Sequence, residues 1–210
     1  MHDIIKDLNW RYATKKYDSS KKIKENDLEV IKESLRLVPS SYGLQPLKFI
    51  IVNSPKLREK LKPISYNQSQ ITDASHLIII CSYINIDASH VDEYLLNILR
   101  TRNVSSNNME AYGNAMKITI NKMKNDEKYR WNKNQAYIAL GQLIPTCARL
   151  RIDATPMEGF NTKEYDKLLN LRDQNLTASL VVPIGYRHKE DKVQHEKKVR
   201  KSQDDLFITL

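Results

Sequence analysis

Long apolar runs are missing from this chain of 210 residues. No stretch approaches the roughly 18 consecutive apolar residues that a membrane-spanning helix needs, so we expect no membrane partner. The first segment, Met1 to Lys16, alternates charged and apolar side chains and lacks the apolar centre of a signal peptide. We therefore expect a cytoplasmic protein.

Most motifs that mark a catalytic site in a sequence are absent as well. The chain has no G-x-G-x-x-G after a strand and no G-x-x-x-x-G-K-[ST], which excludes the usual dinucleotide and nucleoside-triphosphate loops. It also lacks C-x-x-C, H-E-x-x-H and G-x-S-x-G. His76 has no second His or Cys at metal-ligand spacing, so we expect a structural hydrogen bond there and no metal site. If the protein is an enzyme, a cofactor should carry its chemistry.

Cysteine is scarce and basic charge is abundant. Cys81 and Cys147 each lie in an apolar run, which predicts buried free thiols in a reducing compartment and not a disulfide framework. The formal net charge is +9. This charge is compatible with three partners, namely nucleic acid, an anionic membrane surface or a small ligand that carries phosphate.

The apolar pattern predicts a single domain over residues 1–210. Continuous runs of β-branched residues are typical of buried strands, and apolar residues at helical spacing predict amphipathic helices. Because strands and helices alternate irregularly, we expect an α+β fold and not a doubly wound one. Strands are expected at 48–53, 77–83 and 177–186, and helices at 3–8, 27–37, 55–61, 134–150 and 163–171, with two more helices in 88–124 joined by 103–108.

Four segments concentrate polar groups that plain connectors would not need. Leu37 to Pro46 (L-V-P-S-S-Y-G-L-Q-P) joins a helix to a strand, and Asp153 to Phe160 (D-A-T-P-M-E-G-F) follows a buried helix. In N-W-R-Y-A-T-K-K-Y-D, alternation places Arg11, Ala13 and Lys15 on one side of an extended segment, where cations can grip one anion. The alternative is a solvated basic strand. The fourth segment is K-K-V-R-K in the tail.

Taken in order, these motifs resemble the nitroreductase family of FMN enzymes along essentially the whole chain. They are R-Y-A-T-K-K-Y-D, P-S-S-Y-G-L-Q-P, N-Q-S-Q-I-T-D-A-S-H-L-I-I-I-C, P-M-E-G-F and K-V-R. The likeness is to the branch of oxygen-insensitive NAD(P)H nitroreductases and dihydropteridine reductases. It implies a central, mainly antiparallel sheet flanked by helices, and an intertwined homodimer that exchanges C-terminal strands. Separately from the resemblance, the polar surroundings of the helices expected within residues 88–130 suggest a helical excursion over the active site.

The resemblance assigns FMN contacts to particular positions of this chain. It places Lys15 and Asn67 at the pyrimidine edge of the flavin, and it directs the backbone N–H of Glu158 at flavin N5, so Lys15 and Glu158 are the expected catalytic positions. The phosphate is expected at Arg11, Lys198 and Arg200, with Tyr12 and Ala13 beside them. The remaining expected cofactor-binding residues are Gln70 near the ring edge, Pro156, Met157 and Gly159 in the loop under the ring, and Ser40, Ser41 and Gln45, which would reach the FMN of the other subunit.

The chain departs from this pattern at four positions. Gly43 stands where the branch usually has asparagine, and Gln70 stands where it has a second lysine near the ring. Pro145 replaces an ordinary helix residue and should kink the helix near Gly141 to Pro145. Arg151 replaces a helix-ending glycine.

The function implied by the resemblance is hydride transfer from NADH or NADPH, through flavin N5, to a nitroaromatic or quinone acceptor by a ping-pong mechanism. Alternatives in the same class reduce a dihydropteridine or a free flavin, or remove a halogen reductively. A non-enzyme alternative is a basic nucleic-acid-binding module built on Trp10, Arg11, Tyr12 and Lys15. Because basic residues are spread along the chain without a nucleic-acid motif, we expect no nucleic acid partner.

Overall fold

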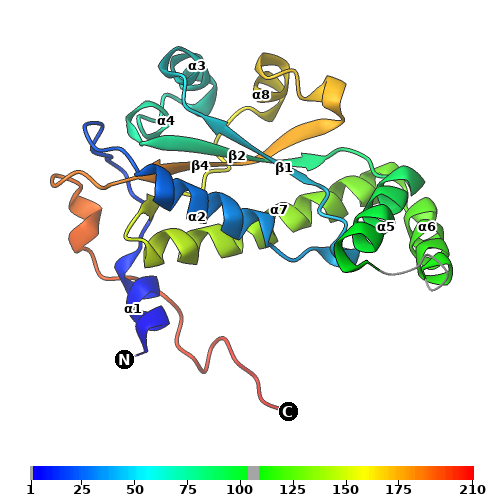
Figure 1. Ribbon diagram of the computed structural model, residues 1–210. Helices are drawn as coiled ribbons and strands as arrows, with labels where there is room; N and C mark the ends of the chain where they lie inside the picture. The colour runs from blue at the N-terminus through cyan, green and yellow to red at the C-terminus, as the bar shows by residue number, and fades with distance from the viewer. Residues whose placement is uncertain (1, 104–108) are drawn as a thin grey trace.

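A four-stranded antiparallel sheet forms the centre of the protein. The structure, a computed structural model, describes residues 2–103 and 109–210. The strands lie in the order β1-β2-β4-β3, and each neighbouring pair is antiparallel (Figure 1). Their bounds are β1 Leu47–Val52, β2 His76–Tyr83, β3 Asp153–Ala154 and β4 Leu176–Gly185. The α+β fold and the antiparallel sheet predicted from the sequence are therefore confirmed.

The two central strands, β2 and β4, are the most buried part of the chain. All residues of β4 are buried, as are the six inner residues of β2. Their apolar runs, residues 77–81 of β2 and 180–184 of β4, fit this position, because both faces of the sheet are covered. A bulge between Ile80 and Cys81 shifts the register of the β2–β4 pair.

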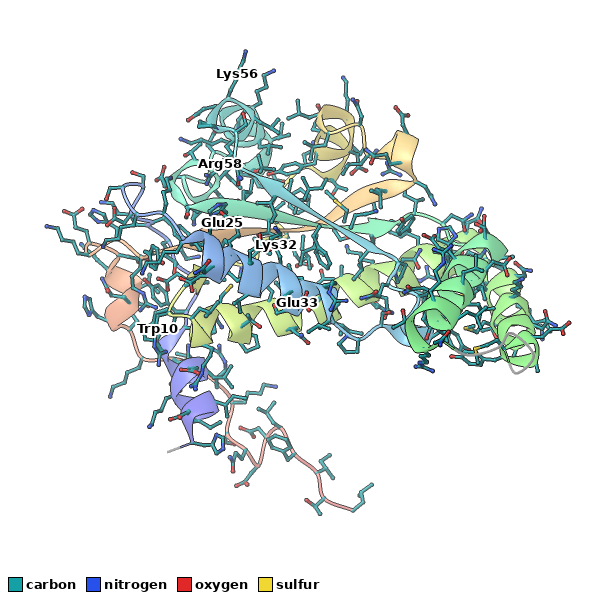
Figure 2. All side chains as sticks on the ribbon, in the orientation of Figure 1. Trp10, Glu25, Lys32, Glu33, Lys56 and Arg58 are labelled. Carbon is teal, nitrogen blue, oxygen red and sulfur yellow. The ribbon has the colours of Figure 1, made fainter. Side chains whose placement is uncertain are left out.

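Helices cover both faces of the sheet. One face carries α2 (Glu25–Arg36) and the long α7 (Asn125–Arg149), and the other carries α3 (Pro55–Leu61), α4 (Gln70–Asp73) and α8 (Thr162–Leu168) (Figure 1). In Figure 2, Lys32 and Glu33 of α2 and Arg58 of α3 mark these opposite faces. Cys147 lies in the core of the first face and Cys81 in that of the second, so both stay free thiols, as expected.

Three helices lie outside these two layers. At one end, α5 (Ala88–Arg102) and α6 (Glu110–Lys122) pack on each other around a small core with Val91 and Met116. At the other end, α1 (Asp3–Trp10) packs beside the C-terminal end of α7 (Figure 1). The predicted connection at 103–108 falls mostly on residues 104–108, which lie outside the described residues. Short 3₁₀ turns occur at Ser41–Gly43, Pro63–Ser65, Arg172–Gln174 and Lys192–His195.

The structure corrects three details of the sequence-based prediction. The helix expected at 27–37 begins at Glu25, with Lys24 as its N-cap, and ends at Arg36. The helix expected at 134–150 begins at Asn125 and continues in α-helical form through Pro145. The short strand β3 was not predicted. In the part of the chain that the structure describes, no helix combines the length and apolar character needed to cross a membrane.

Candidate functional site

Stacked aromatic and guanidinium groups anchor the segment that follows α1. The Arg187 guanidinium lies 4.2 Å from the centre of the Trp10 ring and 4.5 Å from that of Tyr12. The same guanidinium forms an ion pair of 2.6 Å with buried Asp153. In Figure 2, Trp10 lies between α1 and the end of α7. This stack fixes where the chain leaves α1, and the Arg187 charge is already neutralised.

The unusual Arg151 belongs to the same anchor. Its φ of +57° is left-handed, a conformation that favours glycine at the end of a helix. Its guanidinium ion-pairs at 2.8 Å with the buried carboxylate of Asp7 and lies 5.1 Å from the centre of the Trp10 ring. Arg149 donates to the other oxygen of Asp7 at 3.3 Å. Arginine thus replaces a helix-ending glycine because its side chain ties α7 to α1.

Three cations meet where the end of α1 approaches the C-terminal tail. The Lys198 ammonium donates to the Arg11 carbonyl oxygen. The pKa of Arg11 is lowered by burial and, next, by the charge of the neighbouring Arg200. The pKa of Lys198 is likewise lowered, mainly by burial and then by the charges of Arg11 and Arg200. The Arg11 Nε atom is buried without a hydrogen-bond partner, and within residues 2–103 and 109–210 no carboxylate ion-pairs with these cations. Mutually repelling cations, one of which holds a buried N–H without an acceptor, are chemically suited to an anion.

The chain from Tyr12 to Tyr17 connects this cation cluster to the loop after β3. The Tyr12 hydroxyl and the backbone N–H of Lys15 both donate to the carboxylate of Asp191, at 3.0 and 2.8 Å. The Thr14 carbonyl accepts a hydrogen bond of 2.9 Å from Thr155, next to the loop at 156–159. The Lys15 side chain is exposed. Ala13 lies between these anchors and is half-buried.

The loop at 156–159 is held from several sides. Met157 is buried and forms a β-bridge with Val181, and Pro156 precedes it half-buried. The Gln68 side chain donates a hydrogen bond of 2.9 Å to the Gly159 carbonyl oxygen. The Tyr137 hydroxyl of α7 donates to the Glu158 carboxylate. These contacts fix a loop whose residues Glu158 and Gly159 remain exposed.

The amide residues expected at the ring edge occupy the segment beside this loop. Asn67 is exposed and left-handed, with a φ of +56°, while Gln70 is buried at the start of α4. Tyr66 and Gln68 also lie beside Gly159, although they were not among the expected site residues. Neither they nor Tyr137 could be found from sequence spacing, because each acts through a contact with a distant segment.

The loop at 40–45 lies apart from all these groups. Its Ser40 hydroxyl accepts a hydrogen bond of 2.8 Å from the backbone N–H of Gln45. The Gln45 side chain donates a hydrogen bond of 2.9 Å to the Arg36 carbonyl oxygen at the end of α2. The backbone N–H of Ser41 donates a hydrogen bond of 2.9 Å to the side-chain oxygen of Gln135 in α7. Figure 1 places this loop beside α5, whereas α1 lies at the opposite end of the molecule, where the C-terminal tail begins. Within one chain, Thr14 and Thr155 thus connect the segment after Arg11 to the loop at 156–159, whereas no hydrogen bond among the described residues links the cations to the loop at 40–45.

An open apolar groove of about 860 Å³ runs between α1, α2 and α7. Its walls include Ile4, Leu8, Val30 and Ile138, each with 41% or more of its surface exposed. Exposed apolar residues this numerous and close together are typical of a surface that another protein covers.

Comparison with known proteins identifies the family. The model of the Nitroreductase family matches residues 8–186. Over 215 residues the chain is 34% identical to a Staphylococcus saprophyticus protein named as an NAD(P)H nitroreductase, covering 99% of this chain and 96% of the relative. It is 33% identical to the major NAD(P)H-flavin oxidoreductase of Aliivibrio fischeri, covering 100% of this chain and 99% of that protein.

Solved structures agree with this assignment at the level of the fold. A nitroreductase-like protein from Streptococcus mutans superposes with a TM-score of 0.87 at 16% identity, covering 99% of this chain and 98% of the other. A protein from Exiguobacterium sibiricum, solved in complex with FMN, superposes with a TM-score of 0.85 at 17% identity, covering 100% and 98%. On the family match and the two relatives, this chain belongs to the nitroreductase family.

Proposed function

We propose that this protein is an FMN-dependent oxidoreductase that uses NADH or NADPH to reduce a small electron-poor acceptor. The observation that carries the proposal is the cluster of Arg11, Lys198 and Arg200. These cations repel each other, and Arg11 holds a buried N–H without an acceptor. A phosphate group fits such a cluster because guanidinium and ammonium donors form short, charge-assisted hydrogen bonds with it.

The names of related proteins support FMN as the group that carries this phosphate. One relative is named as an NAD(P)H-flavin oxidoreductase, and a protein of the same fold contains FMN. FMN, when bound, supplies hydride transfer, which fits a chain without a nucleophile or metal-binding motif. The cations would hold the phosphate, with Tyr12 and Ala13 beside it.

The chain's own groups would then position and polarise the flavin ring. Lys15 would place positive charge near the ring edge, where it favours the negative charge that hydride uptake adds. Asn67 and Gln70 would face the same edge. The loop from Pro156 to Gly159, held by Val181, Gln68 and Tyr137, would lie under the ring, with the Glu158 N–H available as a donor.

We also propose that a second copy of the chain completes the site. The loop at 40–45, which carries Ser40, Ser41 and Gln45, lies beside α5, whereas α1 lies at the opposite end of the chain (Figure 1), so this loop would serve the site of another copy. The groove between α1, α2 and α7 offers an apolar surface for that copy. In Figure 1 the tail runs away from the body, and its Leu206, Phe207, Ile208 and Leu210 are exposed. The strand β1 lies at the edge of the sheet and can accept another strand. Exchange of C-terminal strands would pair the partner's tail with β1 and would bury the exposed apolar residues of that tail.

In this arrangement the helices within 88–130 would project over a site. They form a unit at one end of the sheet with their own small core, next to the loop at 40–45. If that loop reaches the partner's flavin, α5 and α6 reach the same place. They would then help to define the space available to the acceptor.

Nitroaromatics and quinones are the acceptors that we propose, with alternating binding of the two substrates in a ping-pong mechanism. A free flavin is the second candidate, because one relative is named for that activity. Dihydropteridines and halogenated aromatics complete the set to be tested.

A two-stage stopped-flow experiment tests the proposed function. The purified protein is mixed with NADH or NADPH without oxygen, and the reduced protein is then mixed with each acceptor. We expect flavin absorbance to bleach in the first stage and to return in the second. A protein that retains no flavin, even after incubation with FMN, and that binds DNA in a salt-sensitive manner would contradict the proposal.

A further inference from the structure

The carboxylate of Asp191 is buried at a junction between segments that are far apart in the sequence. Only 3% of the residue is exposed. One oxygen accepts from the Tyr12 hydroxyl at 3.0 Å and from the backbone N–H groups of Lys15 and Lys16 at 2.8 and 3.1 Å. The other oxygen accepts from the N–H of Val193 at 3.2 Å. Four hydrogen bonds nearly exhaust what one carboxylate can accept.

These hydrogen bonds join the two segments that carry the cation cluster. Tyr12, Lys15 and Lys16 follow shortly after Arg11, whereas Val193 lies in the 3₁₀ turn Lys192–His195, which precedes Lys198 and Arg200. The bond from the Lys198 ammonium to the Arg11 carbonyl oxygen is a second tie between the same segments. Asp191 therefore holds the segment that carries Arg11 next to the segment that carries Lys198 and Arg200.

All four donors to Asp191 are neutral. Burial alone would raise the pKa of Asp191, but the hydrogen bonds from the backbone of Lys16 and Lys15 and from Tyr12 lower it below its ordinary value. The carboxylate is thus stabilised in its charged form without an ion pair among the described residues. Asp153 differs, because it neutralises Arg187 directly. Asp191 holds the backbone in place while the nearby cations keep their charge for an anionic ligand.

We infer that Asp191 is a positioning residue that shapes the phosphate-binding cluster of Arg11, Lys198 and Arg200. The inference rests on the proposed function, since it takes FMN as the ligand. Asp191 acts through Tyr12 and the backbone of the segment after α1, and it does not itself contact the phosphate. Its effect should therefore fall on the phosphate end of the cofactor and spare the ring.

Binding of FMN and of riboflavin tests this inference, because riboflavin has the same ring but no phosphate. Both dissociation constants are measured by fluorescence titration of the full-length protein from which the flavin has been removed. In Asp191→Asn we expect FMN affinity to fall about ten-fold, the factor that corresponds to about 1.4 kcal/mol, with riboflavin affinity unchanged. Glu190→Gln is the matched control, since Glu190 is the exposed neighbour and, among the described residues, pairs with exposed Lys16 and half-buried His188.

Each outcome decides for or against the inference. Equal losses for FMN and riboflavin would mean that Asp191 merely holds the fold, and tighter FMN binding would mean that it acts through its charge; either result overturns the inference. If Asp191→Asn does not fold, Tyr12→Phe removes one of the four hydrogen bonds and must still weaken FMN more than riboflavin. Failure of the wild-type protein to bind either flavin would instead contradict the proposed function.

Discussion

The phenol ring of Tyr94 occupies the space in which a side chain at Gly43 would lie. A Cβ atom added to Gly43 would fall 2.6 Å from the Tyr94 hydroxyl oxygen and 2.9 Å from the ring carbon that bears it. Gly43 also has a φ of +75°, in the left-handed region. The glycine in the loop at 40–45 is therefore matched to a tyrosine of α5.

Gly43→Ala should destabilise the protein through both effects. We expect a loss of about 1–3 kcal/mol in the free energy of unfolding, from backbone strain and from overpacking against Tyr94. Chemical denaturation of Gly43→Ala, Tyr94→Ala and the double variant measures how the two positions interact. The double variant should be more stable than the sum of the single losses predicts, because the smaller residue at 94 removes the clash. Strictly additive losses would show that the contact has no energetic weight.

Removal of either tail cation should weaken FMN retention. Lys198→Ala and Arg200→Ala each take away a charge-assisted donor, so we expect the dissociation constant of FMN to rise about ten-fold. The effect should shrink at high salt, which screens partly exposed charges. Lys197→Ala and Lys201→Ala are the controls, since both lysines are exposed neighbours. An FMN affinity that does not change in flavin titrations would remove these residues from the phosphate site.

Lys15→Met should slow flavin reduction more than it weakens FMN binding. The exposed Lys15 ammonium is proposed to stabilise charge that develops on the ring, so its loss acts on the rate of hydride transfer. We expect bleaching by NADH to slow about ten-fold, which corresponds to about 1.4 kcal/mol in the barrier. The control is Lys16→Met, because Lys16 pairs with Glu190 on the surface. Equal bleaching rates in stopped flow for wild type and Lys15→Met would contradict this role.

Protonation of His76 should make the fold less stable in mild acid. Burial, together with Arg58 and Lys22, lowers the pKa of His76 below its ordinary value of 6.5, and its Nδ1 lies 2.9 Å from the Ser75 hydroxyl oxygen. The unfolded chain therefore takes up a proton at higher pH than the folded chain does. The stability contributed by neutral His76 is complete above pH 6.5 and is lost as the pH falls through the lowered pKa.

Unfolding by denaturant at about pH 7.5 and about pH 5.5 measures this effect. His76→Gln should lose less stability between the two pH values than the wild type loses. His195→Gln serves as the control, because His195 is exposed. Identical pH dependence in His76→Gln and wild type would show that another group is responsible.

The parts of the fold that the sequence predicted are those governed by local pattern. The apolar runs at residues 77–81 of β2 and 180–184 of β4 contain no polar side chain, so their burial on both faces could be expected. The first turns of α7 could not, because residues 125–133 are mostly polar. Asn132, for example, is fully buried there, and its side-chain amide donates a hydrogen bond of 2.9 Å to the Tyr83 carbonyl oxygen. Such a contact depends on a segment that is distant in the sequence.

The residues of the candidate site also fall into those that the sequence could predict and those that only the structure shows. Arg11 and Lys15 could be proposed because they lie among aromatic residues in one short segment, and Lys198 because it lies in a basic tail; the resemblance then gave all three their roles. Asp191 could not, because a single aspartate in a charged tail looks like a surface residue until its four donors are seen. The consequence of Gly43 also required the structure, since Tyr94 is separated from it in the sequence.

A pair of complementing variants tests most directly whether the site is a flavin site shared by two chains. One chain carries Arg11→Ala and Arg200→Ala, and the other carries Ser41→Trp, which should block the partner's site by its bulk. Heterodimers are isolated with two affinity tags and compared with a doubly tagged wild-type dimer. We expect neither variant homodimer to bind FMN and the heterodimer to regain one FMN, because one of its two sites lacks both changes. Full FMN binding by the Ser41→Trp homodimer, or none by the heterodimer, would contradict the account.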